Sequence, residues 1–247
     1  MKKSETKVDV QQPGQQRSGD APPSCIAIDG PVASGKSAVG SRVARKLGYR
    51  FIDTGVMYRA VTWLALERKV GLSDEAALTR MAEEAQLTLA PGPPDAPEAA
   101  RVVIDGADVT DRLRSAEVGE AVSLVSRVAG VRRAMVDLQR QLAAAGGVVM
   151  AGRDIGTVVL PDAPLKVYLD ASAEERVRRR HDELVATGRE ASPEEVRQEL
   201  ALRDAIDSGR DVSPLRPAED AIMIHTDHLA LDEVVEQIME HVAQCRS

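Results

Sequence analysis

Gly30-Pro31-Val32-Ala33-Ser34-Gly35-Lys36-Ser37 matches the pattern G-x-x-x-x-G-K-[ST] at every required position of this 247-residue chain. The apolar run 25–28 precedes it and a helical pattern from about residue 37 to 47 follows, which is the context of a triphosphate-binding loop. The backbone N–H groups of such a loop surround an anion, and the helix adds its N-terminal dipole. We expect Lys36 to reach the outer phosphates and Ser37 to hold Mg²⁺. The expected triphosphate ligands are Gly30, Ala33, Ser34, Gly35, Lys36, Ser37 and Ala38.

Outward from this loop, short apolar runs alternate with helical patterns. Strands are expected at 25–28, 50–53, 147–151, 165–169 and 221–224, and helices at 56–68, 115–145 (broken near Gly130) and 231–242. Ser172 with Glu175, and Ser192 with Glu195, fit helix-capping boxes. Strands that alternate with helices indicate an α/β fold with a parallel sheet. The segment 86–110, with a strand and hairpin turn at 102–106 and a proline-rich loop at 90–97, predicts a small insertion.

Composition excludes several classes of function. The net charge is −7, which argues against a general nucleic-acid or anionic-membrane surface. Only five aromatic residues occur, too few for a platform that stacks single-stranded bases. No apolar run approaches the length of a membrane span, and the two distant cysteines favour a reducing compartment. We therefore expect a cytoplasmic protein that acts on small molecules.

Arginines gather in segments that follow the expected strands. They occur in Asp53-Thr54-Gly55-Val56-Met57-Tyr58-Arg59, in Gly152-Arg153-Asp154-Ile155-Gly156-Thr157 and in Arg203-Asp204-Ala205-Ile206-Asp207-Ser208-Gly209-Arg210. In open parallel sheets, ligands bind beyond the carboxyl ends of the strands. Arginines from several segments that meet there indicate a second phosphorylated ligand beside the triphosphate, which is the arrangement of a phosphotransferase.

A fourth group of arginines follows the strand 165–169. Arg176, Arg179 and Arg180 have the i, i+3, i+4 spacing of one helix face, so they can bind phosphate together. Arg178 lies off that face and is expected to be solvated.

The loop, followed by D-[ST]-G-x-x-Y-R, G-R-D-I-G-T-V-V and R-D-x-x-D-S-x-R, resembles the bacterial cytidylate kinases over residues 24–247. The resemblance implies an α/β fold of the P-loop nucleoside monophosphate kinases, in which a parallel sheet is flanked by helices. It implies a monophosphate-binding region at about 54–115 and a lid at about 175–215. The implied reaction is Mg²⁺-dependent transfer of the γ-phosphoryl group of ATP to CMP or dCMP.

The resemblance also implies roles for individual residues. It assigns Arg59, Arg153 and Arg210 to the acceptor phosphate and the transferring phosphoryl group, so these and Lys36 are the expected catalytic residues. It assigns Arg203 and Asp207 to the sugar and phosphate side. The lid arginines Arg176, Arg179 and Arg180 would close over ATP. The remaining expected contacts to the monophosphate are Thr54, Tyr58, Ser123, Arg132 and Asp154.

Ser123, Arg132 and Asp154 are the residues that the resemblance assigns to cytosine, and their chemistry suits that base. Cytosine offers an amino donor beside ring acceptors, which a carboxylate and a guanidinium can match. Uracil would instead turn a carbonyl oxygen toward the carboxylate. Such a site discriminates more strongly than an apolar pocket.

Several alternatives remain open from sequence alone. The acceptor could be UMP, AMP or shikimate, or the chain could be a P-loop module that hydrolyses ATP slowly and signals to a partner. Asp154 could pair with Arg153, and Asp207 with Arg210, in purely structural roles. Asp53 is expected to anchor the segment that it begins rather than to touch substrate. Related sequences often carry an acid where Ala151 stands, so a role for that position is in doubt.

The expected organisation is a disordered tail at 1–23 and a single kinase domain at 24–247, acting as a monomer. The tail is polar and has no hydrophobic period, so it cannot bury enough apolar area to offset the entropy of ordering. Met57 and Met135 have apolar neighbours at helical spacing and are expected in the core.

Overall fold

Five parallel strands form the central sheet of the computed structural model, which describes residues 23–90 and 100–245. The strand order is β2-β6-β1-β7-β8. The strands are β1 (Cys25–Asp29), β2 (Arg50–Asp53), β6 (Val148–Gly152), β7 (Leu165–Asp170) and β8 (Ile222–His225). All their pairings are parallel. The α/β prediction is confirmed, and each expected strand appears within one residue or so of its predicted bounds.

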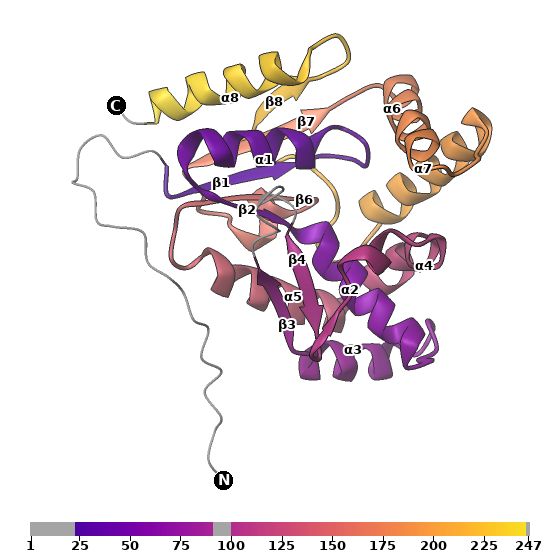
Figure 1. The fold of residues 1–247 in the computed structure, drawn as a ribbon. Helices are drawn as coiled ribbons and strands as arrows, with labels where there is room; N and C mark the ends of the chain where they lie inside the picture. The colour runs from indigo at the N-terminus through magenta and orange to yellow at the C-terminus, as the bar shows by residue number, and fades with distance from the viewer. Residues whose placement is uncertain (1–22, 91–99, 246–247) are drawn as a thin grey trace.

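Helices cover both faces of this sheet because β1 alternates its side chains between them. Ile26 and Ile28 pack with the helices α1 (Lys36–Leu47) and α8 (Leu231–Gln244). Ala27 points to the opposite face and joins a larger core. That core includes Met57 and Met135, as expected. Figure 1 shows α1 and α8 together on one side of the strands, and α2 (Thr54–Glu67) and α5 (Ala129–Ala143) on the other.

The segment between β2 and β6 contains more regular structure than the sequence predicts. It holds α3 (Glu75–Glu84), the antiparallel sheet β3 (Leu87–Ala90), β4 (Arg101–Ile104) and β5 (Ala107–Asp108), a 3₁₀ turn at Thr110–Arg114 and α4 (Ala116–Ser126). The hairpin at Asp105-Gly106 is confirmed. The helix α3 and the strand β3 are additions, because residues 75–90 carry no long apolar period. The proline-rich loop falls mainly outside the described residues, as does the tail.

The helix expected over 115–145 is interrupted earlier than predicted. The break lies at Arg127 and Val128, between α4 and α5, whereas Gly130 is inside α5. Gly130 is needed there for space, since a Cβ on it would lie 2.1 Å from Oγ1 of Thr79 in α3. The predicted break near Gly130 is thus present, two residues earlier, while Gly130 itself permits close helix packing.

Replacing Gly130 with alanine should therefore push α3 and α5 apart. We expect a loss of about 1–3 kcal/mol in the free energy of unfolding, the usual cost of overpacking. The matched control is Gly119→Ala in α4, where a Cβ meets nothing within 4 Å. Urea unfolding should show Gly119→Ala at or above wild-type stability, and equal effects of the two variants would contradict the packing argument.

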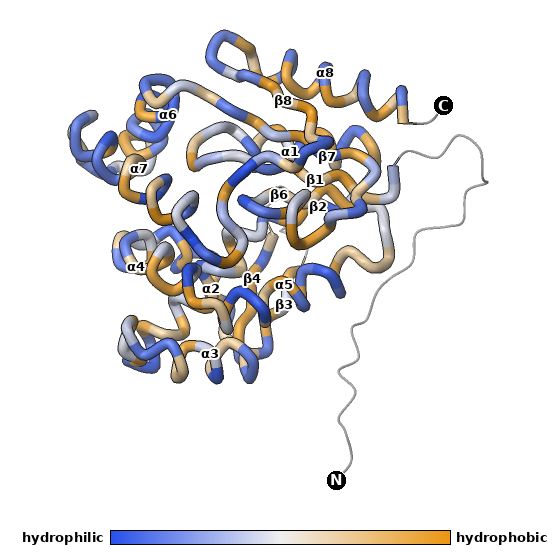
Figure 2. The backbone as a smooth tube through the Cα atoms, turned by 180° about the vertical axis from the view of Figure 1, so that it is seen from behind, coloured by the Kyte–Doolittle hydropathy of each residue, from blue (hydrophilic) through white to orange (hydrophobic). Residues whose placement is uncertain are grey.

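A helical hairpin lies beyond the end of β7. It consists of α6 (Ala173–Ala186) and α7 (Pro193–Ser208), and Figure 1 shows the two helices side by side, away from the main sheet. Val177, Leu184, Val196 and Leu200 form a small core of their own, against which Val32 of the phosphate loop also packs. Figure 2 shows the strands as mainly apolar and the outer turns of the hairpin as mainly polar.

The capping predictions for this hairpin are half confirmed. Ser192 and Glu195 form the full capping box of α7, with Pro193 as its first residue. Ser172 caps α6, but the carboxylate of Glu175 binds Arg178 and Arg179 instead of returning to the cap. Among residues 23–90 and 100–245, no helix is long and apolar enough to cross a membrane.

Candidate active site

The phosphate loop turns sharply between β1 and α1. Gly30 has φ of 150°, and a Cβ there would lie 2.1 Å from the carbonyl oxygen of Leu169, so only glycine fits. Gly35 is left-handed, with φ of 95°, and stands at the N-terminus of α1. Ala33 also takes a positive φ. The loop therefore has the tight, glycine-dependent curvature that the motif predicts.

Lys36 is buried within this loop, and its ammonium donates hydrogen bonds to the carbonyl of Pro31 and the hydroxyl of Ser34. Burial, assisted by the positive charge of Arg153, lowers the pKa of Lys36 well below its usual range. An anion bound in the loop would counter that effect, because a nearby negative charge favours the ammonium. The loop is thus electrostatically suited to phosphate.

Ser37 and Asp53 bring two oxygen ligands together beside the loop. The hydroxyl of Ser37 donates to Oδ2 of Asp53 over 2.6 Å, while Oδ1 accepts from the backbone N–H of Gly55. Asp53 therefore anchors α2 as expected, and it also lies next to the predicted Mg²⁺ ligand. The sequence analysis missed this second role. Within the described ranges, no three His, Cys, Asp or Glu side chains form a metal-binding group.

Arg153, Asp207 and Arg210 form the centre of the predicted phosphate site. Nε of Arg153 lies 2.9 Å from Oδ2 of Asp207, and Nη2 of Arg210 lies 3.5 Å from Oδ1 of the same carboxylate. Burial alone would raise the pKa of Asp207, but the two arginines outweigh it and lower the pKa. One carboxylate thus holds two guanidinium groups, one from the segment after β6 and one from just after α7.

A second group of cations surrounds Arg59. Burial, with the charges of Arg203 and Arg180, lowers the pKa of Arg59 to about 10. Burial and Arg153 likewise lower the pKa of Arg203. Nε of Arg180 and Nε of Arg203 are buried without hydrogen-bond partners. Arg180 pairs with Glu183 and Arg203 with Glu199, but burial and the neighbouring cations still lower the pKa of Arg59 and Arg203, and a bound dianion would counter that effect. Arg180 was expected to bind ATP, but its charge acts on Arg59, a residue predicted to bind the acceptor phosphate.

The arginines of α6 do not all make the same contacts. Nη1 of Arg176 lies 2.7 Å from Asp204 and 3.4 Å from the carbonyl of Val32. Arg179 binds Glu175 and Thr226, and its Nη1 lies 3.8 Å from where a Cβ on Gly35 would be. Arg176 and Arg179 therefore lie against the phosphate loop. Arg178 points to solvent and pairs with Glu175 and Asp182, as expected for a solvated residue.

Arg132 and Asp154 form a buried ion pair. Nη2 of Arg132 lies 2.5 Å from Oδ2 of Asp154, and both side chains are at most 5% exposed. The alternative pairing of Asp154 with Arg153 is therefore wrong. Burial favours the neutral form of Arg132, but Tyr58 and Asp154 outweigh it and raise its pKa. The guanidinium carbon stands 5.2 Å from the centroid of the Tyr58 ring.

Three other predicted contacts lie around this pair. Ser123 is buried on α4, and its carbonyl accepts from the hydroxyl of Ser126, whose own carbonyl binds Arg132. Thr54 is buried, with its hydroxyl on the carbonyl of Ala151. Nε of Arg132 is buried without a hydrogen-bond partner. Burial raises the pKa of Tyr58 to about 12, so its hydroxyl stays protonated. No sequence motif indicates the contact of Ser126 with Arg132.

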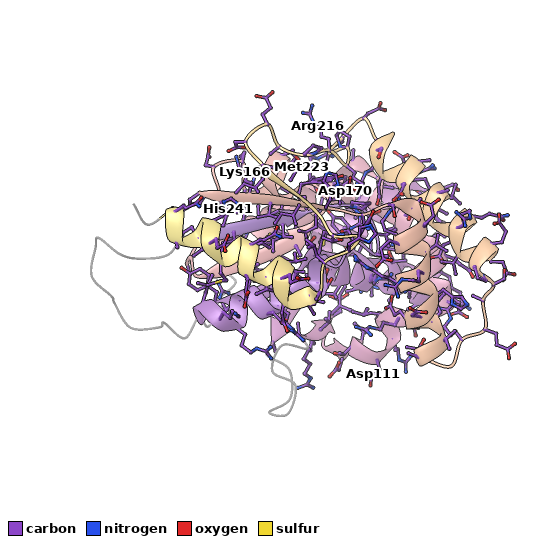
Figure 3. All side chains as sticks on the ribbon, turned by 90° about the horizontal axis from the view of Figure 1, so that it is seen from above. Asp111, Lys166, Asp170, Arg216, Met223 and His241 are labelled. Atoms are coloured by element: carbon purple, nitrogen blue, oxygen red, sulfur yellow. The ribbon has the colours of Figure 1, made fainter. Side chains whose placement is uncertain are left out.

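Asp170, the last residue of β7, lies outside these groups. Its Oδ1 accepts from the N–H of Ala171, and its Oδ2 lies 3.7 Å from Nδ1 of His225. Figure 3 shows Asp170 on the lid side of the molecule and Lys166 further from the lid. Asp170 thus stabilises the connection from β7 to the lid.

A family profile described as cytidylate kinase matches residues 26–244 of this chain. A cytidylate kinase of Bacillus licheniformis is 50% identical over 218 residues, which are 88% of this chain and 95% of that protein. The cytidylate kinase of Geobacillus sp. strain WCH70 is 51% identical over 88% of this chain and 95% of its own length. The cytidylate kinase of Carboxydothermus hydrogenoformans is 47% identical over 219 residues, which are 89% of this chain and 97% of that protein.

Proposed function

Because the chain belongs to the cytidylate kinase family, and is therefore a phosphotransferase, we propose that it transfers the γ-phosphoryl group of ATP to CMP or dCMP. The products are ADP and the corresponding diphosphate. The catalytic task is to hold two anions close and in line, and to neutralise the charge that spreads over the transferring group. No covalent intermediate with the protein is required.

The observation that carries this proposal is the set of buried arginines beside the phosphate loop. Arg59, Arg153 and Arg203 lie together there, and burial with the neighbouring cations lowers the pKa of Arg59 and of Arg203 even though acids also lie nearby. A switch or a simple ATPase has no use for a second phosphate clamp. We propose that Arg59 and Arg203 hold the acceptor phosphate, while Lys36, Arg153 and Arg210 neutralise the transferring phosphoryl group. The remaining phosphate-side residue, Asp207, orients the two guanidinium groups that it binds.

Base selection is proposed to depend on the buried pair Arg132 and Asp154. The carboxylate accepts from the amino group of cytosine, and the guanidinium donates to its acceptors. The geometry of the pair supports this role, since each partner fixes the other. Ser123 adds a hydroxyl, and Tyr58 lies against the guanidinium as a support. Thr54 holds α2 against the end of β6 and so sets the floor of the acceptor site.

The oxygen donors of Ser37 and Asp53 fit a Mg²⁺ ion, which prefers a few hard oxygen ligands and completes its shell with water and phosphate oxygens. When bound, the ion would screen the charge between the phosphates. Gly30, Ala33, Ser34, Gly35 and Ala38 would surround the phosphates of ATP from the loop, and Arg176 and Arg179 would close over them. Lid closure would exclude water and so limit ATP hydrolysis.

We also propose that the protein acts as a monomer in the cytoplasm, on small nucleotides rather than on nucleic acid or membranes. The net charge of −7 and the scarcity of aromatic residues support this. Light scattering on a sizing column measures the oligomeric state directly.

An acceptor panel tests the proposed function. ADP release should be measured with CMP, dCMP, UMP, AMP and shikimate at saturating ATP and Mg²⁺, together with a sample that contains no acceptor. We expect CMP and dCMP to dominate, with little release in the absence of an acceptor. Strong turnover of AMP without turnover of CMP would overturn the assignment to cytosine. Equal ATPase activity with and without CMP would indicate a P-loop module that is not a kinase.

A further inference from the structure

Asp29 is a buried acid that no motif of the sequence analysis includes. It is the last residue of β1, directly before Gly30, and only 3% of it is exposed. Its Oδ1 accepts the backbone N–H of Ile155 over 2.8 Å, and its Oδ2 accepts that of Gly156 over 2.7 Å. Those two amides immediately follow Arg153 and Asp154. Asp29 thus joins the phosphate loop to the segment that contacts the acceptor.

The amides belong to the first turn of a π-helix, Ile155–Val159. The residue at its N-terminus, Asp154, would ordinarily cap such a turn with its own carboxylate. It makes no capping bond here, and its carboxylate pairs with Arg132 instead. Asp29 supplies the missing acceptor from another strand, so Asp154 is free to bind Arg132. A π-turn inside a functional segment is itself a common sign of a specialised site.

The charged form of Asp29 does not serve to stabilise the fold. Burial raises its pKa to about 6, the two backbone hydrogen bonds and Lys36 act in the opposite direction, and Asp154 raises it further. The titratable groups that face it are Lys36 from α1, Asp154 after β6 and Tyr168 from β7. An acid whose folded-state pKa is raised contributes stability at low pH that is lost as the pH rises through 6. At neutral pH the fold therefore holds this carboxylate at a cost.

We propose that Asp29 is a positioning residue that couples the triphosphate loop to Arg153 and Asp154. The two hydrogen bonds set the start of the π-turn, and this in turn fixes the backbone from which both side chains project. Arg153 and the carboxylate of Asp154 are thereby kept in fixed positions relative to the loop that binds the triphosphate. This inference rests on the proposed function.

The variant Asp29→Asn tests the coupling with almost no change of shape. An amide offers one acceptor oxygen, and its NH₂ group would face the second backbone donor without a hydrogen bond. We expect kcat/KM for CMP to fall by about a hundredfold, as displacement of a reacting group by an ångström can do. The KM for ATP should stay unchanged, because the loop itself is intact. Asp74→Asn is the control, since Asp74 caps α3 far from the site, and it should leave both constants at their wild-type values.

A pH profile separates positioning from a purely structural role. The phosphate of CMP titrates near pH 6 in every variant, whereas Asp29 titrates only in the wild type. Between pH 7.5 and 5, kcat/KM for CMP should therefore fall more steeply in the wild type than in Asp29→Asn. Parallel profiles, or equal losses for ATP and CMP, would overturn the proposal.

Two further readouts keep the test decisive. If Asp29→Asn does not fold, the wild type can be titrated by NMR, where the amide protons of Ile155 and Gly156 should shift with a midpoint near pH 6. Flat curves would contradict the proposed contact. A wild-type protein that does not phosphorylate CMP would refute the proposed function instead, so the two failures are distinguishable.

Discussion

Replacing Arg210 with alanine should lower kcat by about 10²–10³-fold, while the affinity for ATP changes little. The guanidinium is buried, and its Nη2 makes no hydrogen bond although it lies 3.5 Å from the Asp207 carboxylate. Because this nitrogen is fixed in position but unpaired, it can donate to the negative charge that develops on the phosphoryl group during transfer. Loss of one such donor typically lowers kcat by about 10²–10³-fold. Steady-state kinetics with both substrates varied, together with equilibrium ATP binding, give the comparison.

The control for this variant is Arg178→Ala. Arg178 lies on the lid but points to solvent, where it binds only Glu175 and Asp182, so its removal takes away an arginine without touching the site. We expect kcat within error of the wild type for Arg178→Ala. A normal kcat for Arg210→Ala would remove Arg210 from the catalytic residues. Asp207 keeps its contact with Arg153 in this variant, so the fold should remain intact.

Asp154→Asn should impair both stability and base selection. It leaves Arg132 buried without a counter-charge, and breaking a buried ion pair in this way costs about 3 kcal/mol. The new amide can donate to the carbonyl of uracil, whereas the carboxylate repels it. We expect the ratio of kcat/KM for CMP to that for UMP to fall by at least about tenfold, the usual discrimination of one well-placed hydrogen-bond pair.

The ratio of kcat/KM for CMP to kcat/KM for UMP is the decisive measurement here, because it does not depend on the fraction of folded enzyme. Arg101→Ala provides a comparison, since its ion pair with Asp108 is exposed and remote from the site. It should change neither the selectivity nor, by more than about 1 kcal/mol, the stability. An unchanged selectivity for Asp154→Asn would place base reading elsewhere.

The main sheet and the phosphate loop were predictable because each depends on local patterns. The run from Cys25 to Ile28 is apolar throughout, as a strand buried on both faces requires, and glycine at positions 30 and 35 is demanded by the turn. The helix α3 and the strand β3 were not predictable in this way. The helix α3 buries only Leu78, Met81 and Ala82, where α5 lies opposite and Gly130 allows the approach, and β3 has no fully buried residue.

In the candidate site, the residue types were predictable but several pairings were not. Arg132 and Asp154 lie 22 residues apart, and the packing of α5 against the π-turn Ile155–Val159 after β6 brings them into contact. The pairing of Asp154 with its neighbour Arg153, left open as an alternative from sequence alone, does not form, because Arg153 reaches across to Asp207 on α7. Asp29 was missed for the same reason, because its partners are backbone amides 126 and 127 residues away that no side-chain pattern can reveal.

The separate core of the lid has a mechanical consequence. Because Val177, Leu184, Val196 and Leu200 bury one another, we expect the hairpin to move as a unit without unpacking the central sheet. Its apolar contact with the phosphate loop is made through Val32. We therefore expect substitutions on the outer surface of the hairpin to change the rate at which it opens and closes more than they change the chemical step, whereas substitutions of Val32 should affect both.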